Sequence, residues 1–237
     1  MRKVTQRVAP LIWFIQPPNL PQKGEAYRSP NEEESHASGR RWWNGNDRAA
    51  VVAALSARHD VVTAGRSEGA VQFDMAQPES IQEMFRIVGG FDALVSAAGQ
   101  AKFGSLGELK DTDYQFSFAN KLMGQANLVR IGREFIADGG SFTLTSGVLG
   151  QKPMKGSAAI SMVNAGLEGF VRAAALELPR GIRVNVVSPP WVTETLIRLK
   201  MDQSHGMSAA SVAQAYVRCV EGSMTGQTID PRKMPHQ

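Results

Sequence analysis

Short β-branched runs alternate with stretches of helical periodicity from Ala49 to the end of the chain. Strands separated by helices in this way favour right-handed βαβ units and a parallel, doubly wound sheet. We therefore expect a single Rossmann-like α/β domain over residues 49–237. The expected strands are 59–65, 71–73, 91–96, 141–146, 182–187 and 227–229, and the expected helices are 49–58, 79–88 after Pro78, one within 111–138, 156–177 and 209–221.

The first 48 residues break this alternation. They hold Pro10, Pro17, Pro18, Pro21 and Pro30 of the 12 prolines, and an acidic run at 32–34. A doubly wound fold needs a first strand there, followed by a glycine-rich turn that brings backbone amides to a pyrophosphate. Residues 44–48 offer one glycine. We expect residues 1–48 to be an atypical, poorly ordered segment in which the first strand and its loop have been replaced.

A shift of reading frame is one explanation for this segment. Trp42 and Trp43 are each encoded by TGG, and the codons of 44–48 leave few bases open. Read one base later, with permitted choices at the open bases, they give Gly-Gly-Thr-Gly-Thr-Ile-Gly. The hypothesis is that residues up to about 48 are out of register with an ancestral gene. The alternative is a genuine, divergent N-terminal extension.

Composition limits the class of protein. A chain of 237 residues with 43% hydrophobic content can bury one substantial core. Of the net charge of +4, most comes from residues 1–48, which hold 8 Lys/Arg and 5 Asp/Glu, so no basic stripe predicts nucleic-acid binding. The single cysteine, Cys219, excludes an internal disulfide and fits a reducing cytoplasm.

Targeting and metal signals are weak. Residues 8–15 are apolar and resemble a signal-peptide core, but Pro17 follows and no cleavage site is evident, so we expect a cytoplasmic protein. No apolar run approaches the roughly 20 residues of a membrane span. The four histidines are scattered and predict no metal site.

Arg66 and Ser67 stand at the end of the second expected strand. In dinucleotide folds an acidic residue here binds the ribose 2′-hydroxyl, whereas an arginine accommodates a 2′-phosphate. A planar cation beside a hydroxyl suits phosphate oxygens. The pair favours NADP over NAD, and the alternative is a solvated loop arginine.

Three later motifs together resemble the short-chain dehydrogenase/reductase family. They are Ser96-Ala97-Ala98-Gly99, the strand 141–146, and Ser188-Pro189-Pro190-Trp191-Val192-Thr193. The resemblance covers about residues 49–230. It implies an oxidoreductase that moves a hydride between a nicotinamide cofactor and a carbonyl or alcohol.

The resemblance also assigns roles to single residues. Asp74 would meet the adenine amino group, and Met75 would pack on the adenine ring. The small residues closing the fourth strand would approach the nicotinamide-side ribose, and the segment after the sixth would bracket the carboxamide. The cofactor-binding candidates are Arg66, Ser67, Asp74, Met75, Ala97, Ala98, Gly99, Lys121, Pro189 and Val192.

The family's Tyr-x-x-x-Lys pair is missing. Ile160 and Asn164 occupy its two places, and Ser146 stands 14 residues before Ile160. Gly147 is an equally good partner for the family's serine. Isoleucine cannot transfer a proton and asparagine carries no charge, so the ordinary reaction should be severely impaired. The resemblance extends to a subgroup of the family that lacks both residues.

Lys121 offers a compensation. The resemblance places it where the family usually carries an asparagine, which implies that lysine and asparagine are exchanged between Lys121 and Asn164. The hypothesis is that the Lys121 ammonium takes the place of the missing lysine's, which retains cofactor binding without proton transfer. The alternative is a lysine that reaches solvent from a helix edge. Ser146 and Lys121 are the catalytic candidates.

Three interpretations remain open. The first is an NADP-linked oxidoreductase with an altered proton route, acting on a small-molecule substrate. The second is a non-catalytic dinucleotide-binding or partner-binding protein of the same fold. The third is a damaged product lacking its first strand and loop. The helix at 156–177 is apolar on most faces, which predicts a homodimer or homotetramer.

Overall fold

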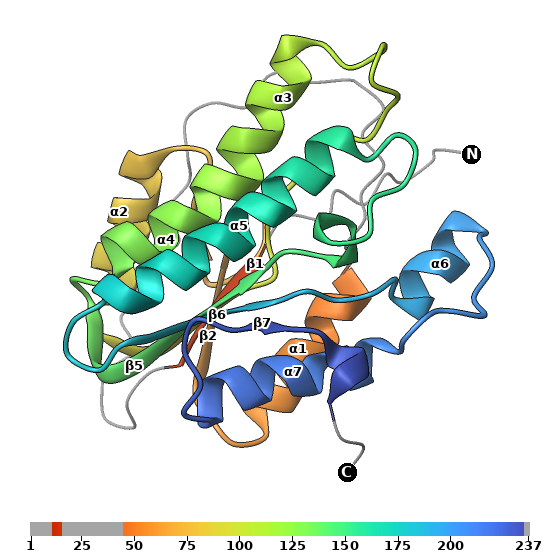
Figure 1. The fold of residues 1–237 in the computed structure, drawn as a ribbon. Coiled ribbons are helices and arrows are strands. Elements are labelled where there is room, and N and C mark those ends of the chain that lie inside the picture. The colour runs from red at the N-terminus through yellow and green to blue at the C-terminus, as the bar shows by residue number, and fades with distance from the viewer. Residues whose placement is uncertain (1–10, 16–44, 235–237) are drawn as a thin grey trace, which may run out of the picture.

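A computed structural model describes residues 11–15 and 45–234 of the chain. A seven-stranded sheet runs through its centre in the order β3-β2-β1-β4-β5-β6-β7. Helices α2, α4 and α5 cover one face, and α1 and α7 pack together on the other (Figure 1). This three-layer arrangement is the α/β, Rossmann-like fold that the alternation of strands and helices predicts.

Most elements fall where the sequence places them. The strands are β1 (Leu11–Ile15), β2 (Val61–Gly65), β3 (Val71–Gln72), β4 (Phe91–Ser96), β5 (Ile136–Thr145), β6 (Arg183–Val187) and β7 (Thr228–Ile229). The helices are α1 (Gly45–Ser56), α2 (Pro78–Val88), α3 (Asp111–Ser117), α4 (Gly124–Gly132), α5 (Ala158–Glu177), α6 (Thr193–Leu199) and α7 (Ala209–Glu221). Three single turns complete them: the π-helical η1 (Phe118–Met123) and the 3-10 turns η2 (Val148–Gly150) and η3 (Pro231–Lys233).

Helix α2 shows why the sequence determines these elements locally. Pro78 occupies its first turn, where a missing N–H costs nothing. Ile81, Met84, Phe85 and Val88 recur at helical spacing and are all buried. Gly89 then ends the helix with a φ of 74°, a conformation that glycine adopts freely.

Two apolar cores flank the sheet. Phe85 lies 5.6 Å from Phe91 and 5.3 Å from Phe135, both stacked, and Phe91 meets Phe142 edge-on at 6.1 Å. This aromatic group belongs to the core beneath α2, α4 and α5. On the other face, Leu55 of α1 and Tyr216 of α7 are fully buried. The core therefore reaches both faces of the strands that end at the candidate site.

Strand β1 differs from the expectation for the first 48 residues. Residues 11–15 fill the place between β2 and β4, antiparallel to both, with Leu11 opposite Gly65 and Ile15 opposite Val61. The other strand pairs are parallel. An apolar pentapeptide can complete either kind of ladder, because both pair backbone N–H and C=O groups. The boundary at residue 48 also shifts, since α1 begins at Gly45.

Two further predictions need correction. The long helix within 111–138 is broken by the π-helical turn η1 and ends at Gly132, because β5 already begins at Ile136. The segment after β6, for which the sequence predicts no helix, contains the seven-residue helix α6. That helix stops at Lys200, which adopts a left-handed conformation with a φ of 55°. Local sequence signals predict neither the π-helical break nor α6, and both depend on tertiary contacts.

Candidate functional site

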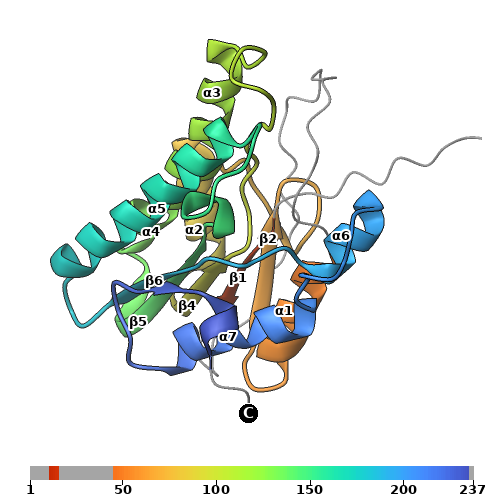
Figure 2. The ribbon, with the colours of Figure 1, turned by 45° about the vertical axis from the view of Figure 1, so that its right-hand side comes forward.

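The loops that follow β4, β5 and β6 meet at one edge of the sheet (Figure 2). The Ser146 amide donates to the Val187 carbonyl at 2.9 Å, and the Val148 amide donates to the Pro189 carbonyl at 3.0 Å. Gly104 likewise donates to the Gly156 carbonyl at 2.9 Å. Ligands of doubly wound sheets bind outside this carboxyl edge. The three loops therefore form one continuous wall where a ligand is expected.

Lys121 lies beneath this wall, on the π-helical turn η1. Its side chain is only 8% exposed, and Nζ donates a hydrogen bond of 3.0 Å to the Ser146 carbonyl. Burial lowers the pKa of Lys121 to about 8, because a desolvated ammonium is less stable than a hydrated one. π-Helical turns are frequent at functional sites. The ammonium thus points inward, and the alternative of a lysine reaching solvent is not what the structure shows.

Gly99 makes room for this lysine. Its φ of +120° is a backbone conformation that other residues rarely adopt, and a Cβ there would lie 2.9 Å from Cγ of Lys121. Ala97 and Ala98, which precede it, are both buried. The small residues at the end of β4 therefore allow close approach, here by Lys121 itself.

Asn164 occupies the matching position on α5. Its Nδ2 lies 3.5 Å from the Gly147 carbonyl oxygen, at the limit of a hydrogen bond. The side chain is 1% exposed, and Oδ1 has no partner among the described residues. Lys121 and Asn164 thus reach the carbonyls of two consecutive residues, Ser146 and Gly147. The two positions related by the exchange are brought together, as the sequence hypothesis requires.

These groups leave hydrogen-bonding capacity for a ligand. A buried acceptor without a partner costs roughly 1–3 kcal/mol, so Asn164 Oδ1 calls for a donor. An ammonium has three N–H donors, and Lys121 uses one of them on Ser146. A ligand hydroxyl can both donate and accept. The residues present therefore fit the ribose end of a nicotinamide dinucleotide.

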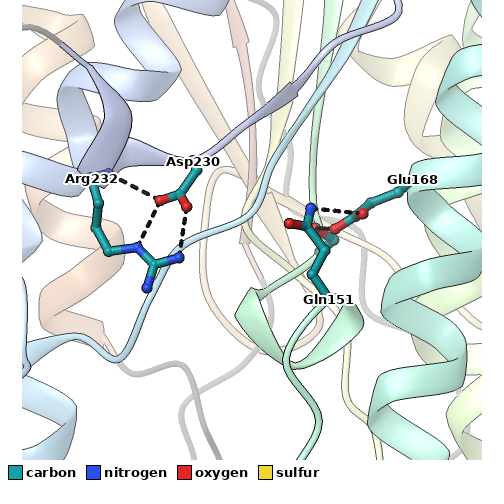
Figure 3. A network of polar contacts seen from close by, with 5 residues as sticks. Gln151, Glu168, Asp230 and Arg232 are labelled. Atoms are coloured by element: carbon teal, nitrogen blue, oxygen red, sulfur yellow. Dashed lines mark hydrogen bonds and ion pairs between the residues drawn. The ribbon is translucent and has the colours of Figure 1, made fainter.

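Ser146 itself is held from both ends. Its carbonyl accepts from Lys121, while its hydroxyl donates to Oε1 of Glu168 at 3.0 Å. Gln151 donates to the other carboxylate oxygen at 3.0 Å, and Figure 3 shows Gln151 and Glu168 facing each other. Ser146 is 3% exposed and Glu168 6%. The hydroxyl is therefore committed to a buried carboxylate on α5.

Sequence reasoning missed Glu168. Glu168 is the one polar side chain within residues 165–171 of α5, and that contrast was the available signal. Buried carboxylates are rare unless they are hydrogen-bonded, and Glu168 meets this rule through Ser146 and Gln151. Ile160, which the sequence resemblance aligns with the family's tyrosine, is buried at 6% exposure and offers no proton.

Arg66 and Asp74 meet at the other end of the candidate site. Their side chains form an ion pair of 3.5 Å between Nη2 and Oδ2, and the arginine remains 58% exposed. Asp74 also accepts from the Ala76 amide at 2.9 Å, which fixes its turn. Ser67 is exposed beside Arg66. An exposed arginine in a long ion pair can turn to a phosphate at little cost.

Two other candidates lie in the core. Met75 is 3% exposed and packs against α4, where a Cβ on Gly124 would lie 2.5 Å from its Cγ. Val192 is 3% exposed, belongs to the core beneath α1 and α7, and forms a bridge with Met207. Neither side chain presents a surface to a ligand. Pro189 contributes its carbonyl, which accepts from Val148.

A second polar contact closes the same edge after β7. Arg232 pairs with Asp230 at 2.6 Å, and this hydrogen-bonded partner lowers the pKa of the carboxyl (Figure 3). Asp230 also accepts from the Arg232 amide and so begins η3. Among the described residues, no group of three or more His, Cys, Asp or Glu side chains could hold a metal ion.

The chain matches known proteins over most of its length. Residues 45–225 match the family described as enoyl-(acyl carrier protein) reductase. The crystal structure of the protein lin1944 from Listeria innocua is 38% identical, with a TM-score of 0.76 over 78% of this chain and 94% of that one. A small-chain dehydrogenase in complex with NADPH is 27% identical, with a TM-score of 0.67 over 78% of this chain and 91% of the other.

Curated relatives are matched over a smaller share. The 3-oxoacyl-[acyl-carrier-protein] reductase of Mus musculus is 32% identical over 146 residues, which are 58% of this chain and 62% of that protein. An uncharacterized oxidoreductase of Methylorubrum extorquens is 30% identical over 170 residues, 70% of this chain and 66% of its own length. The chain thus spans less than two thirds of these relatives. With the family match, the fold and the site, it belongs to the short-chain dehydrogenase/reductase family of oxidoreductases.

Proposed function

We propose that this chain binds NADP(H) and acts on a carbonyl/alcohol pair by an altered, impaired proton route. One observation carries the proposal: Lys121 and Asn164 reach the Ser146 and Gly147 carbonyls at the carboxyl end of β5. The site therefore retains one ammonium and one amide where the family places a lysine and an asparagine.

The described residues have distinct roles toward the cofactor. A bound nicotinamide cofactor supplies or accepts the hydride. Lys121 and Asn164 would hold its ribose hydroxyls, with the ammonium donating and the free Oδ1 accepting. Arg66 would take the 2′-phosphate, which is why NADP is preferred to NAD. The neighbouring structure solved with NADPH supports this choice.

Proton transfer is the impaired step. No phenol replaces the family's tyrosine at position 160, and the Ser146 hydroxyl donates to Glu168. A positioned acid or base is worth roughly 10²–10⁴ in rate, so turnover should be lower by a factor of this order. Ser146, directly after β5, is the group we assign to the substrate oxygen, and its hydroxyl would leave Glu168 to make that contact.

The second candidate function is a non-catalytic dinucleotide-binding protein. The contact between Ser146 and Glu168 favours it, because a hydroxyl committed to a buried carboxylate is not directed at a substrate. In that case Lys121 and Asn164 would serve binding alone.

Binding and turnover measured together separate these functions. The thermal unfolding midpoint is measured with and without NADPH, and NADPH oxidation is followed with a panel of aldehydes and ketones. Binding with slow turnover that Ser146→Ala abolishes supports the oxidoreductase. Binding without any turnover supports the second candidate, and absence of binding contradicts both.

Lys121→Met tests the exchange directly. Loss of the ammonium should weaken NADPH binding about tenfold, the effect of one charge-assisted hydrogen bond. Lys233→Met, an exposed lysine on η3, is the matched control and should bind as the parent does. Equal affinity in the Lys121→Met variant would reject the exchange.

Assembly and location belong to the same proposal. Met123 on η1 and Met162 on α5 are 43% and 40% exposed, and α5 is apolar on most of its surface. We propose that these helices pack against another copy of the chain in a homodimer or homotetramer, and that the protein is cytoplasmic. Within the described residues, no helix has the length and apolarity to cross a bilayer.

A further inference from the structure

The three loops that wall the candidate site carry an excess of positive charge. These substrate-side loops are residues 97–110 after β4, 146–157 after β5 and 188–208 after β6. They hold six Lys/Arg and three Asp/Glu, and the loop 146–157 holds Lys152 and Lys155 with no acidic residue. All three loops leave the same edge of the sheet, so their charges lie on the side of the molecule that carries the candidate site.

The three acidic residues of these loops accept hydrogen bonds from nearby serine hydroxyls or from a backbone amide. Glu108 accepts from the Ser105 hydroxyl at 2.5 Å, which lowers the pKa of its carboxyl. Glu194 accepts from the Ala209 amide at 3.0 Å, at the start of α7. Asp202 accepts from the Ser204 hydroxyl at 2.6 Å, and its pKa is lowered in the same way. These carboxylates fix loop geometry and form no ion pair with a loop lysine.

One of the five lysines in these loops has partners: Lys102 lies 3.9 Å from Asp113 and over the Phe116 ring. The other four are exposed. The structure gives no ion pair, among its described residues, for the other lysines of these loops: Lys110, Lys152, Lys155 and Lys200. Their positive charge is available to a ligand.

The opposite edge of the sheet shows a different arrangement. There Arg58 pairs with Glu221 at 2.8 Å, Arg133 with Glu134 at 3.1 Å and Arg180 with Asp138 at 2.8 Å. These three arginines pair with neighbouring carboxylates, whereas Arg183 at the same edge donates to the Cys219 and Val220 carbonyls. The exposed lysines of the substrate-side loops have no carboxylate partner among the described residues.

We propose that the substrate carries an anionic group, a carboxylate or phosphate, in addition to its reactive carbonyl or alcohol. The inference rests on the proposed function and names its substrate class. Lys152 and Lys155 lie on the loop that follows Ser146 and are the principal contacts for the anion. The exposed lysines stand on three separate loops and not along one helix or strand, which favours a small molecule over nucleic acid or an acidic protein surface.

The physical effect is on substrate affinity. Because chemistry limits the impaired reaction, kcat/KM depends on how tightly the substrate binds and not on how fast it arrives. Two exposed charges together change the affinity for an anion by roughly 2- to 10-fold, and their attraction is screened within about 10 Å at 0.1 M salt. Salt should therefore reduce kcat/KM for an anionic substrate and spare a neutral one.

The test compares a 2-oxo acid with its methyl ester as substrates for NADPH oxidation. The double variant Lys152→Gln/Lys155→Gln should lose about fivefold in kcat/KM for the acid, through weaker binding, and less than twofold for the ester. Arg86→Gln on α2, distant from the site, is the control and should change neither. Equal losses for acid and ester, or none, would overturn the proposal.

Binding keeps the test decisive if turnover is absent. Saturation-transfer NMR of the same acid and ester reports contact with the protein directly. Preferential binding of the acid that the double variant abolishes supports the anionic substrate even where the proposed oxidoreductase activity fails. Equal binding of both compounds, or salt-sensitive binding of an acidic protein without preference for the acid, overturns it.

Discussion

Strands β1 and β4 lie side by side in the middle of the sheet and run in opposite directions. β4 ends at Ser96 on the carboxyl edge, and its loop brings Gly99 against Lys121. β1 ends at Ile15 opposite Val61, the first residue of β2, and therefore at the other edge. Helix α1 ends at Ser56, close to the start of β2, so Gly45 begins at the carboxyl edge.

A strand can complete the sheet without forming the turn that binds the cofactor. β1 completes the ladders of its two neighbours, yet Ile15 and Gly45 lie at opposite edges. In a doubly wound fold the first strand turns directly into the first helix, and that turn holds the pyrophosphate. A shifted reading frame and a genuine, divergent N-terminal extension both stay hypotheses for this difference, and the family match covers residues 45–225.

The largest effect is expected from changing site residues on η1, directly after β5 and on α5, all of which follow β4 in the chain. Restoring the family's residues with Ile160→Tyr, Asn164→Lys, Lys121→Asn and Gly147→Ser should raise NADPH-dependent carbonyl reduction by roughly 10²–10⁴. The tyrosine would supply the missing proton. The same set with Ile160→Phe is the control, because it adds the ring without the hydroxyl, and equal rates in the two variants would contradict the expectation.

The core beneath β4 and β5 should be the region where a substitution lowers the free energy of unfolding most. Phe142 is fully buried against Phe91, and Phe142→Ala should lower the free energy of unfolding by about 3–5 kcal/mol through lost contacts and a cavity. Urea denaturation measures the change. Leu176→Ala, at a side chain 88% exposed, should cost less than about 0.5 kcal/mol. A similar loss at both positions would show that β5 does not anchor the core.

The β1 side of the comparison can be repaired. Replacing residues 1–48 with a Val/Ala-rich strand and Gly-Gly-Thr-Gly-Thr-Ile-Gly should tighten NADPH binding about 100-fold, through two or three backbone N–H bonds to phosphate. Isothermal titration calorimetry measures the affinity. The control carries alanines for the glycines. The encoding DNA decides the hypothesis itself, which fails if the codons shifted by one base do not spell this loop.

Lys121 makes a pH-dependent contribution that needs no cofactor. Its pKa is lowered to about 8 in the folded protein, so above pH 8 the unfolded chain binds more protons than the folded one. Stability relative to Lys121→Met should therefore rise between pH 8 and the ordinary lysine value, by up to about 1.4 kcal/mol per pH unit. Urea titrations at several pH values measure this, and a constant difference would show that the ammonium is not desolvated.

The smallest effect is expected at Ser146. Ser146→Ala removes one hydrogen bond from the buried Glu168 carboxylate, while Gln151 still donates to it. The free energy of unfolding should fall by about 1–2 kcal/mol. Ser161→Ala is the control, because it removes a less buried hydroxyl contact on α5, the helix that carries Glu168. No change at Ser146 would mean that the contact with Glu168 contributes nothing to the fold.

Much of the fold could be predicted because its signals are local. The bounds of β4, α2 and α7 follow from apolar periodicity and from Pro78 and Gly89, which act within a few residues. Arg66 and Asp74 lie together, as the ends of adjacent parallel strands must. The motif resemblance assigns Met75 and Val192 to cofactor binding, but both side chains are buried in the apolar core.

By itself, the sequence determined the order of strands and helices, and it predicted that tyrosine and lysine are missing from the family's catalytic positions and that lysine and asparagine are exchanged. Only the tertiary structure decided that β1 enters antiparallel, that the Ser146 hydroxyl meets Glu168 and that the Lys121 ammonium is buried. The physical reason is distance along the chain. Periodicity, caps and missing side chains act locally, whereas strand direction, burial and hydrogen-bond partners depend on residues that meet only when the sheet and its helices have packed.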